Sequence, residues 1–311
     1  DRAFFQRRLE AALAYRARIF PAETTLRLVY SERDLLPDLI VDRYENCLCV
    51  QIGTLGMDRL RPLIVDALSA RLEPAGIYER SDLSSRTHEG LSPAEGVLLG
   101  RVSDEIALTL DRLSLRVRLG DAQKTGLYLD QRLNRRELLP ISRNARVLDA
   151  FCNTGGFGLY ALQGEAASVL GADLSEACIR QAKAHAALNG FAERAEYVVA
   201  NAFDLLQDLD RKGERFDVVI LDPPAFTKSA QSLPNALRGY KEINLRALRH
   251  LSPGGFLPTS SCSYHLGMED FLVVLRDAVA DARRAARIVS LRGQSRVHPL
   301  HPALPATRYL K

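Results

Sequence analysis

The sequence contains no apolar run near the roughly 20 residues that a membrane-spanning helix needs, which excludes a protein built on such helices. It has no paired CxxC motifs, and its five cysteines, an odd number, give no disulfide framework. No leader of charged and then apolar residues follows Asp1. We therefore expect a cytoplasmic protein with reduced thiols.

A large net charge is also absent, because 42 Lys and Arg residues against 38 Asp and Glu residues leave only +4. Disorder driven by charge is thereby excluded, and 47% hydrophobic residues is ordinary for a globular protein. The basic residues gather at the ends, and residues 276–311 hold eight Lys and Arg against two acids. Basic ends suit a phosphate backbone; the alternative is that Arg283, Arg284 and Arg287 form the solvated face of a helix.

The pattern along the chain divides it into three parts. Residues 1–20 hold a linking helix over 3–19, and residues 21–120 form an α+β domain that ends in a β-hairpin with its turn at Asp111-Arg112. From 121 to 311, strand and helix patterns alternate, which predicts an α/β, Rossmann-like parallel sheet with crossover helices. Its expected strands are 146–151, 169–174, 195–200, 216–221, 255–259, 286–291 and 307–311. Its expected helices are 156–163, 176–188, 203–209 and 235–250.

The first strand of this sheet ends at Asp149 and runs into the turn Asn153–Gly156. Glycine in such a strand-turn-helix connection lets the backbone come close to a ligand at the carboxyl edge of the sheet. The turn has neither the GxGxxG pattern nor the Lys-Ser/Thr of a P-loop, so pyrophosphate binding is poorly supported. An acidic strand end beside this turn suits a ligand that carries an ammonium group.

The next three strand ends carry further polar groups. Asp173 can accept both ribose hydroxyls of a nucleoside, or it can belong to the N-cap region of the following helix. Asn201-Ala202 follows the third strand, and Asp222-Pro223-Pro224 follows the fourth. The two prolines predict a rigid, extended turn that can present the carboxylate to a flat, amino-bearing ring.

Cys262 follows the fifth strand, between two serines, so we expect it at the same carboxyl edge as Asp222. A lone cysteine is more often a small buried hydrophobic residue than a nucleophile. The position of this one at a strand end, among small polar residues, favours a functional role.

Several separate sequence blocks carry a resemblance to a known family. In chain order, the blocks are Gly76–Ser81, Gln123–Arg132, Asp149–Phe157, Asp222–Phe226 and Ser261–Ser263. Together they resemble the class I S-adenosylmethionine-dependent RNA methyltransferases. The nearest resemblance is to the bacterial 23S ribosomal RNA cytosine-C5 methyltransferases that carry an N-terminal PUA domain, a domain expected before Asp1.

The resemblance implies that residues 121–311 form the methyltransferase domain, with S-adenosylmethionine as cofactor and single-stranded or partly folded 23S rRNA as partner. It implies no metal and no membrane, and it leaves a homodimer open. The residues that it assigns are Lys124, Tyr128, Asp130 and Arg132 for the methionine end; Asp149, Phe151, Asn153, Thr154, Gly155 and Gly156 for the binding loop; Asp173 and Leu174 for the ribose; Asn201 and Ala202 for adenine; Asp222 and Pro223 for cofactor and target base; and Cys262 for the nucleophile.

The sequence departs from the family pattern in three places. Asn201 stands where the pattern has Asp, and an amide can donate as well as accept a hydrogen bond. Pro258 falls inside the expected fifth strand, which implies a bulge or a misplaced boundary. Many RNA cytosine-C5 enzymes carry a second cysteine in the turn after Asp222, and this chain has none there.

The implied reaction begins with the Cys262 thiolate, which adds to C6 of cytosine and makes C5 carbanion-like. C5 then takes the methyl group, a base removes the C5 proton, and the thiol leaves. Asp222, protonated or sharing a proton, is expected to hydrogen-bond the N3/N4 edge and stabilise the adduct. No residue in the sequence stands out as the proton acceptor.

Three other functions stay open at this stage. The nearest is N-methylation of a guanine or adenine by the Asp222-Pro223-Pro224 turn, with Cys262 structural. A nicotinamide-dependent oxidoreductase is a second, and the missing GxGxxG counts against it. The third is a catalytically inactive RNA-binding module, which Asn201 and Pro258 favour slightly.

Overall fold

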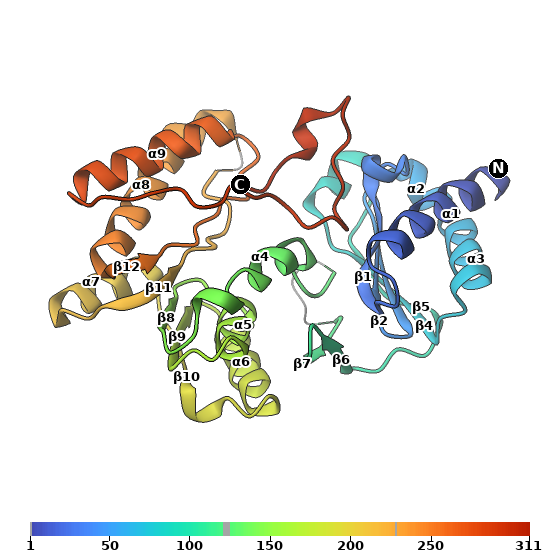
Figure 1. Ribbon diagram of the computed structural model, residues 1–311. Coiled ribbons are helices and arrows are strands. Elements are labelled where there is room, and N and C mark those ends of the chain that lie inside the picture. Colours follow the sequence, from blue (N-terminus) through green and yellow to red (C-terminus); the bar gives the residue numbers. More distant parts are fainter. Residues whose placement is uncertain (1, 121–124, 228) are drawn as a thin grey trace. The chain divides into compact units, whose positions relative to one another are not determined.

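The computed structural model describes residues 2–120, 125–227 and 229–311, and the chain forms two compact units (Figure 1). The first comprises Asp1–Gln131 with Ser295–Thr307, and the second comprises Arg132–Gln294 with Arg308–Lys311. The division thus falls later than the expected boundary at 120/121. The reason is that the Thr125 hydroxyl donates to the buried Asp42 carboxylate, which ties the following segment to the first unit.

The described part of the first unit combines three α-helices with a mixed sheet. The sheet has the order β1-β2-β3-β4-β5, in which β3 and β4 are parallel and the other neighbours antiparallel. A separate hairpin has its turn at Asp111 and Arg112, as predicted, and both residues have positive φ. The elements are α1 (Arg2–Ile19), β1 (Thr25–Tyr30), β2 (Leu39–Tyr44), β3 (Cys47–Ile52), α2 (Leu55–Arg59), α3 (Arg61–Leu72), β4 (Gly76–Ser81), β5 (Ala94–Gly100), β6 (Ile106–Leu110) and β7 (Leu113–Val117).

Helix α1 packs through the apolar face that its spacing predicts, because Phe5, Leu9 and Ala12 are all buried. One of its arginines is not a surface charge. The guanidinium of Arg16 is buried and donates to both carboxylate oxygens of Asp34, with the Nη2–Oδ2 distance at 2.7 Å. The basic N-terminus therefore offers fewer charges to a phosphate backbone than its composition suggests.

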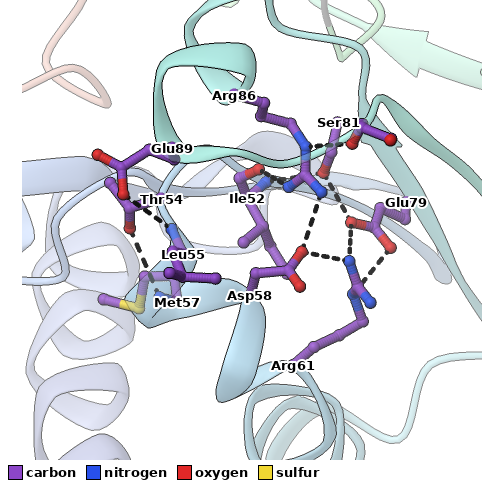
Figure 2. A network of polar contacts seen from close by, with 11 residues as sticks. Ile52, Thr54, Leu55, Met57, Asp58, Arg61, Glu79, Ser81, Arg86 and Glu89 are labelled. Carbon is purple, nitrogen blue, oxygen red and sulfur yellow. Dashed lines mark hydrogen bonds and ion pairs between the residues drawn. The ribbon is translucent and has the colours of Figure 1, made fainter.

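A polar network holds the first unit together where β3 meets the segment after β4 (Figure 2). The buried Arg86 donates to the Ile52 carbonyl at 2.6 Å and to Asp58 Oδ1 at 3.0 Å. Arg61 bridges Asp58 and Glu79, so two arginines and two carboxylates compensate one another. These charges serve the packing of this unit and leave its fold without a buried unpaired ion here.

The second unit is built on a parallel sheet with the order β10-β9-β8-β11-β12. The order reverses beside β8, so the carboxyl ends of β8 and β11 form the switch point at which such sheets bind ligands. The predicted α/β, Rossmann-like fold is confirmed. The elements are α4 (Arg132–Arg136), β8 (Arg146–Asp149), α5 (Gly156–Gln163), β9 (Ser168–Asp173), α6 (Glu176–Leu188), β10 (Ala195–Val199), α7 (Ala202–Lys212), β11 (Phe216–Ile220), α8 (Leu233–His250), β12 (Leu251–Phe256) and α9 (Met268–Asp281).

The last part of the chain differs from the expectation. Strand β12 begins four residues earlier than expected and Pro258 lies after its end, so the boundary was misplaced. Neither 286–291 nor 307–311 forms a strand. The segment 286–291 has a strand-like composition, but a strand needs a hydrogen-bonding neighbour, and no described strand pairs with it.

The helix proposed for the C-terminal arginines is also wrong. Helix α9 ends at Asp281, so Arg283, Arg284 and Arg287 lie beyond it. Arg284 instead donates to the carbonyls of Leu251 and Ser252 in β12. The guanidinium of Arg284 therefore hydrogen-bonds the sheet and does not belong to a solvated helix face.

Gly171 in β9 is required for packing beneath the turn after β8. A Cβ atom there would lie 2.4 Å from Cδ1 of the buried Tyr197 and 3.2 Å from Cβ of Cys152. We therefore expect Gly171→Ala to lower the free energy of unfolding by about 1–3 kcal/mol, as overpacking does. Denaturant titration measures this. Gly56→Ala is the matched control, since nothing lies within 4 Å of its Cβ position; equal losses in both variants would contradict the account.

Candidate functional site

The turn after β8 brings backbone close to the end of the sheet. Asp149 is fully buried, and its Oδ2 accepts a hydrogen bond from the Gly158 amide at 3.0 Å. Asn153 and Gly155 both have positive φ, at 48° and 84°. A Cβ on Gly155 would lie 2.9 Å from the Tyr197 hydroxyl, so only glycine fits this close approach. The turn is thus a backbone cradle that rests on Tyr197.

Asp173 at the end of β9 ties this cradle to the next loop. Its Oδ2 accepts from the Asn153 amide at 3.0 Å and its Oδ1 from the Ser175 amide at 2.9 Å. The N-cap of α6 is Ser175, whose hydroxyl accepts from the Cys178 amide, so the capping role considered for Asp173 belongs to Ser175. Each carboxylate oxygen of Asp173 keeps a second lone pair for a hydroxyl ligand. Leu174 beside it is 71% exposed, an apolar surface next to the carboxylate.

Asn201 at the start of α7 has one half of its amide occupied. Its Oδ1 accepts from the Phe203 amide at 2.9 Å as the helix N-cap, so only the NH₂ group of this side chain can serve as a donor. The side chain of Ala202 is buried in the core, so only its backbone can reach a ligand. Asn201 therefore keeps the oxygen that caps the helix, as the Asp of the family pattern would, but has an NH₂ donor in place of the second carboxylate oxygen.

The loops after β11 and β12 are joined by their backbones and by Asp222. The amide of Leu221 donates to the Pro258 carbonyl, and the amide of Ser260 donates to the Leu221 carbonyl, both at 2.9 Å. The Ser260 hydroxyl then donates to Asp222 Oδ1 at 2.5 Å. Two segments that are far apart in the sequence therefore form one wall of the carboxyl edge.

Cys262 belongs to this wall. Its Sγ lies 3.9 Å from the carbonyl oxygen of Pro223, so the thiol is beside the turn that carries Asp222. Ser261 and Ser263, on either side, are fully buried, and each hydroxyl lies 2.8 Å from the Tyr240 hydroxyl of α8. Cys262 is only half-buried. The loop thus turns its serines inward and leaves the thiol at the surface of the wall.

The remaining predicted residues are placed as follows. Phe151 packs against the core beside β8, and the Thr154 carbonyl lies 3.1 Å from the ring of His185. Tyr128 and the buried Asp130 lie in the first unit, and the buried Arg132 opens the second. Lys124 lies outside the described residues.

No sequence pattern singled out three residues of this region: Arg135, Tyr197 and Tyr240. The guanidinium of Arg135 lies against Gly156, 2.8 Å from the position of a Cβ there, and its Nε has no hydrogen-bond partner among the described residues. In the sequence, an arginine or a tyrosine within a helix or strand pattern is interpreted as an ordinary surface or core residue. Only the tertiary contacts distinguish them.

Comparison with known proteins shows the family to which this chain belongs. A sequence profile described as S-adenosylmethionine-dependent methyltransferase matches residues 94–293. The chain is 40% identical to the ribosomal RNA large subunit methyltransferase I of Photobacterium profundum, over 99% of this chain and 79% of that protein. The chain belongs to the ribosomal RNA large subunit methyltransferase I family. This confirms the resemblance seen in the sequence blocks, and with it the cofactor, S-adenosylmethionine.

Two further comparisons agree. The Aeromonas hydrophila member of the family is 40% identical over all of this chain and 80% of that protein. The crystal structure of SMU.776, described as a methyltransferase complexed with SAH, has the same fold, with a TM-score of 0.88 at 20% identity over 100% of this chain and 80% of that one. No helix in the described part of the chain is long and apolar enough to cross a membrane.

The residues of this family member fit the cofactor. Asp149 Oδ1 has no hydrogen-bond partner among the described residues, and it is the acceptor that an ammonium group needs. Burial raises the pKa of Asp149 to about 7; the Gly158 amide opposes this, and Asp222 and Asp173 add to it. A bound ammonium would hold the carboxylate in its charged form. Among the described residues, no cluster of three or more His, Cys, Asp or Glu side chains could hold a metal ion.

This raised pKa predicts how cofactor affinity depends on pH. If Asp149 binds the ammonium of the cofactor, its carboxylate attracts that group above about pH 7, and the attraction is lost below, where the carboxyl is neutral. We expect the affinity for S-adenosylmethionine to fall as the pH drops from 8 to 6, by up to about tenfold per unit below the pKa. Calorimetric titration at several pH values measures this. Asp149→Asn should bind more weakly with a flatter profile, and an unchanged profile would contradict the assignment.

Proposed function

We propose that this protein methylates C5 of a cytidine in 23S ribosomal RNA, with Cys262 as the nucleophile and Asp222 facing the target base. The observation that carries the proposal is the shared wall: Cys262 Sγ lies 3.9 Å from the carbonyl of Pro223, the residue after Asp222. Relatives at 40% identity are named for the large-subunit ribosomal RNA, which supports the substrate class. We also infer that the protein works in the cytoplasm, and a homodimer stays a prediction.

The residues proposed for the cofactor line the ends of β8, β9 and β10. The cradle Asn153–Gly156 and Asp149 serve the methionine end, Asp173 the ribose, and Asn201 the adenine. S-adenosylmethionine supplies an electrophilic methyl group. We propose Leu174 as an apolar contact for the nucleoside, because its side chain is 71% exposed next to Asp173.

The chemistry requires the chain to make C5 nucleophilic. The Cys262 thiolate forms a bond to C6, and the electron pair moves toward C5 and the N3 edge. Asp222, held by Ser260 and carrying a proton, donates a hydrogen bond to N3 and so stabilises the negative charge that develops on that edge. Once C5 carries the methyl group, its proton leaves to water or another base, and the C6–S bond breaks to return the thiolate.

The target base has to leave its stack to reach this wall. A base in a duplex cannot be attacked at C6 from outside the plane, so the substrate is single-stranded or loosely folded RNA, or a base that is flipped out. The proposal therefore predicts slower methylation of the same site within a stable duplex.

The direct test incubates the protein with labelled S-adenosylmethionine and unmodified 23S rRNA, and then identifies the labelled nucleoside after digestion. We expect 5-methylcytidine. Labelled N-methylguanosine or N-methyladenosine would overturn the assignment and favour the Asp222-Pro223-Pro224 turn acting with a structural Cys262. Binding of RNA without any methyl transfer, although the cofactor binds, would favour an RNA-binding module.

A further inference from the structure

Lys311 is bound to both residues that flank the thiol. Its backbone exchanges two hydrogen bonds with Ser261, one from the Ser261 amide to its carbonyl at 2.9 Å and one from its own amide to the Ser261 carbonyl at 3.1 Å. Its Nζ donates to the Ser263 carbonyl at 2.7 Å. The residues before and after Cys262 are thus both hydrogen-bonded to Lys311, which lies 49 positions after Cys262 in the chain.

The ammonium of Lys311 is placed in an unusual way. The residue is only 8% exposed, and its other hydrogen bond goes to the Tyr309 carbonyl at 2.8 Å. Among the described residues no ion pair neutralises it. Carbonyl oxygens satisfy the donors of an ammonium but leave its net charge in place, and a desolvated charge acts strongly on its neighbours.

The electrostatic coupling between Lys311 and Cys262 agrees with this geometry. Burial lowers the pKa of Lys311, whereas the Cys262 thiolate raises it. Such a coupling is reciprocal, so the ammonium that a thiolate stabilises also stabilises the thiolate.

We propose that Lys311 is a positioning residue for Cys262: it fixes the segment that carries the thiol, and its buried positive charge favours the thiolate. The proposal rests on the proposed function, because a thiolate at this position has a use only if Cys262 is the nucleophile. It adds a residue that neither the sequence blocks nor the site description assigns.

The other charged or titratable groups around the thiol act in both directions. Asp222 belongs to the same wall as Cys262, and its negative charge disfavours the thiolate as long as the carboxyl is ionised. Arg308, in the C-terminal segment, lowers the pKa of Lys311, so its charge lies in the same region. Tyr240 is neutral near pH 7, because burial raises its pKa. His265 lies on the same loop as Cys262. Lys311 is a cation that donates a hydrogen bond to the loop that carries the thiol.

The test measures the rate at which iodoacetamide alkylates Cys262 between pH 6 and pH 10, by mass spectrometry of the peptide that contains it. The unchanged protein is compared with Lys311→Gln, Lys311→Arg and the control Lys241→Gln. Glutamine can still donate to the Ser263 carbonyl but carries no charge, so it separates the charge from the anchoring. Lys241 lies in α8 and forms an exposed ion pair with Asp281.

We expect Lys311→Gln to raise the midpoint of the alkylation profile by about one pH unit, which is about a tenfold loss of thiolate at pH 7. The midpoint of Lys311→Arg should lie close to that of the unchanged protein, because arginine keeps the charge. The midpoint of Lys241→Gln should equal that of the unchanged protein. An unchanged midpoint in Lys311→Gln would overturn the proposal. If Lys311→Gln unfolds, Lys311→Met decides, because methionine fills a similar space without a charge: a midpoint raised by about one pH unit supports the proposal, and an unchanged midpoint overturns it.

Failure of this proposal is distinguishable from failure of the proposed function. Alkylation reports on the thiol without any methyl transfer. If Cys262→Ala retains activity, Cys262 is not the nucleophile, whatever the alkylation profile shows. If Cys262→Ala is inactive and the midpoint does not depend on Lys311, then the nucleophile stands and Lys311 is structural only.

Discussion

Cys262→Ala is expected to lose methyl transfer to 23S rRNA by more than about a thousandfold, while it still binds S-adenosylmethionine. Cytosine C5 is a poor nucleophile, and without a thiolate bond at C6 nothing in this wall makes it carbanion-like. The loss should appear in kcat rather than in the KM for the cofactor, because the thiol lies at the wall of β11 and β12, whereas the cradle lies after β8. Steady-state kinetics with labelled cofactor measures both.

The control for this variant is Cys47→Ala, at a buried cysteine of β3 in the first unit. It should retain its activity per folded molecule. Substantial activity in Cys262→Ala, with the same 5-methylcytidine product, would remove the covalent mechanism. Loss of cofactor binding in that variant would show instead that the side chain serves the fold of the site.

Asp222→Ala is expected to lower kcat by about a hundredfold to a thousandfold, as does the loss of a hydrogen-bonding group that stabilises developing charge. The carboxyl group is held by the Ser260 hydroxyl at 2.5 Å, and its removal would take away the contact that we propose with the N3/N4 edge. Its loss should also lower the pKa of Asp149, since Asp222 is one of the groups that raises it.

Ser260→Ala is the matched variant for this second prediction, because it removes only the hydroxyl that orients the carboxylate. We expect a loss of about tenfold, well below that of Asp222→Ala. If both variants were equally impaired, orientation rather than the carboxylate itself would be the essential feature. If Asp222→Ala kept full activity, the carboxylate would have no part in stabilising the adduct.

Local sequence signals predicted the elements that are defined by local chemistry. The glycine start and the Asn189-Gly190 end predicted helices 156–163 and 176–188, and α5 and α6 have these bounds. The turn at Asp111-Arg112 was likewise predicted, although it contains no glycine. In each case the residues that determine the structure lie within a few positions of it.

The elements that depend on distant partners were missed or misplaced. Strand β12 is defined by its pairing with β11, which shifts register between Phe216 and Val218, and no local pattern shows this. The segment 286–291 has the composition of a strand without a neighbour to pair with. Helix α9 was not predicted at all, although its apolar face packs on α8 through Phe271 and Val274.

The same distinction holds for the site. Asp149 and Asp173 are the last residues of β8 and β9, and Asn201, Asp222 and Cys262 lie in the segments that follow β10, β11 and β12. Their position at one edge follows from the order of a parallel sheet. Tyr197, Tyr240 and Lys311 support them from elsewhere in the chain. Their part depends on side-chain contacts over long sequence distances, which periodicity cannot predict.

The most direct test of the central claim uses an RNA substrate that contains 5-fluorocytidine. Fluorine at C5 cannot leave as the proton does, so the bond between Cys262 and C6 persists after methyl transfer. We predict an RNA–protein complex that survives denaturation, forms only with S-adenosylmethionine, and yields the Cys262 peptide joined to the nucleotide. A protein that methylates unmodified rRNA normally but forms no such complex would contradict the account.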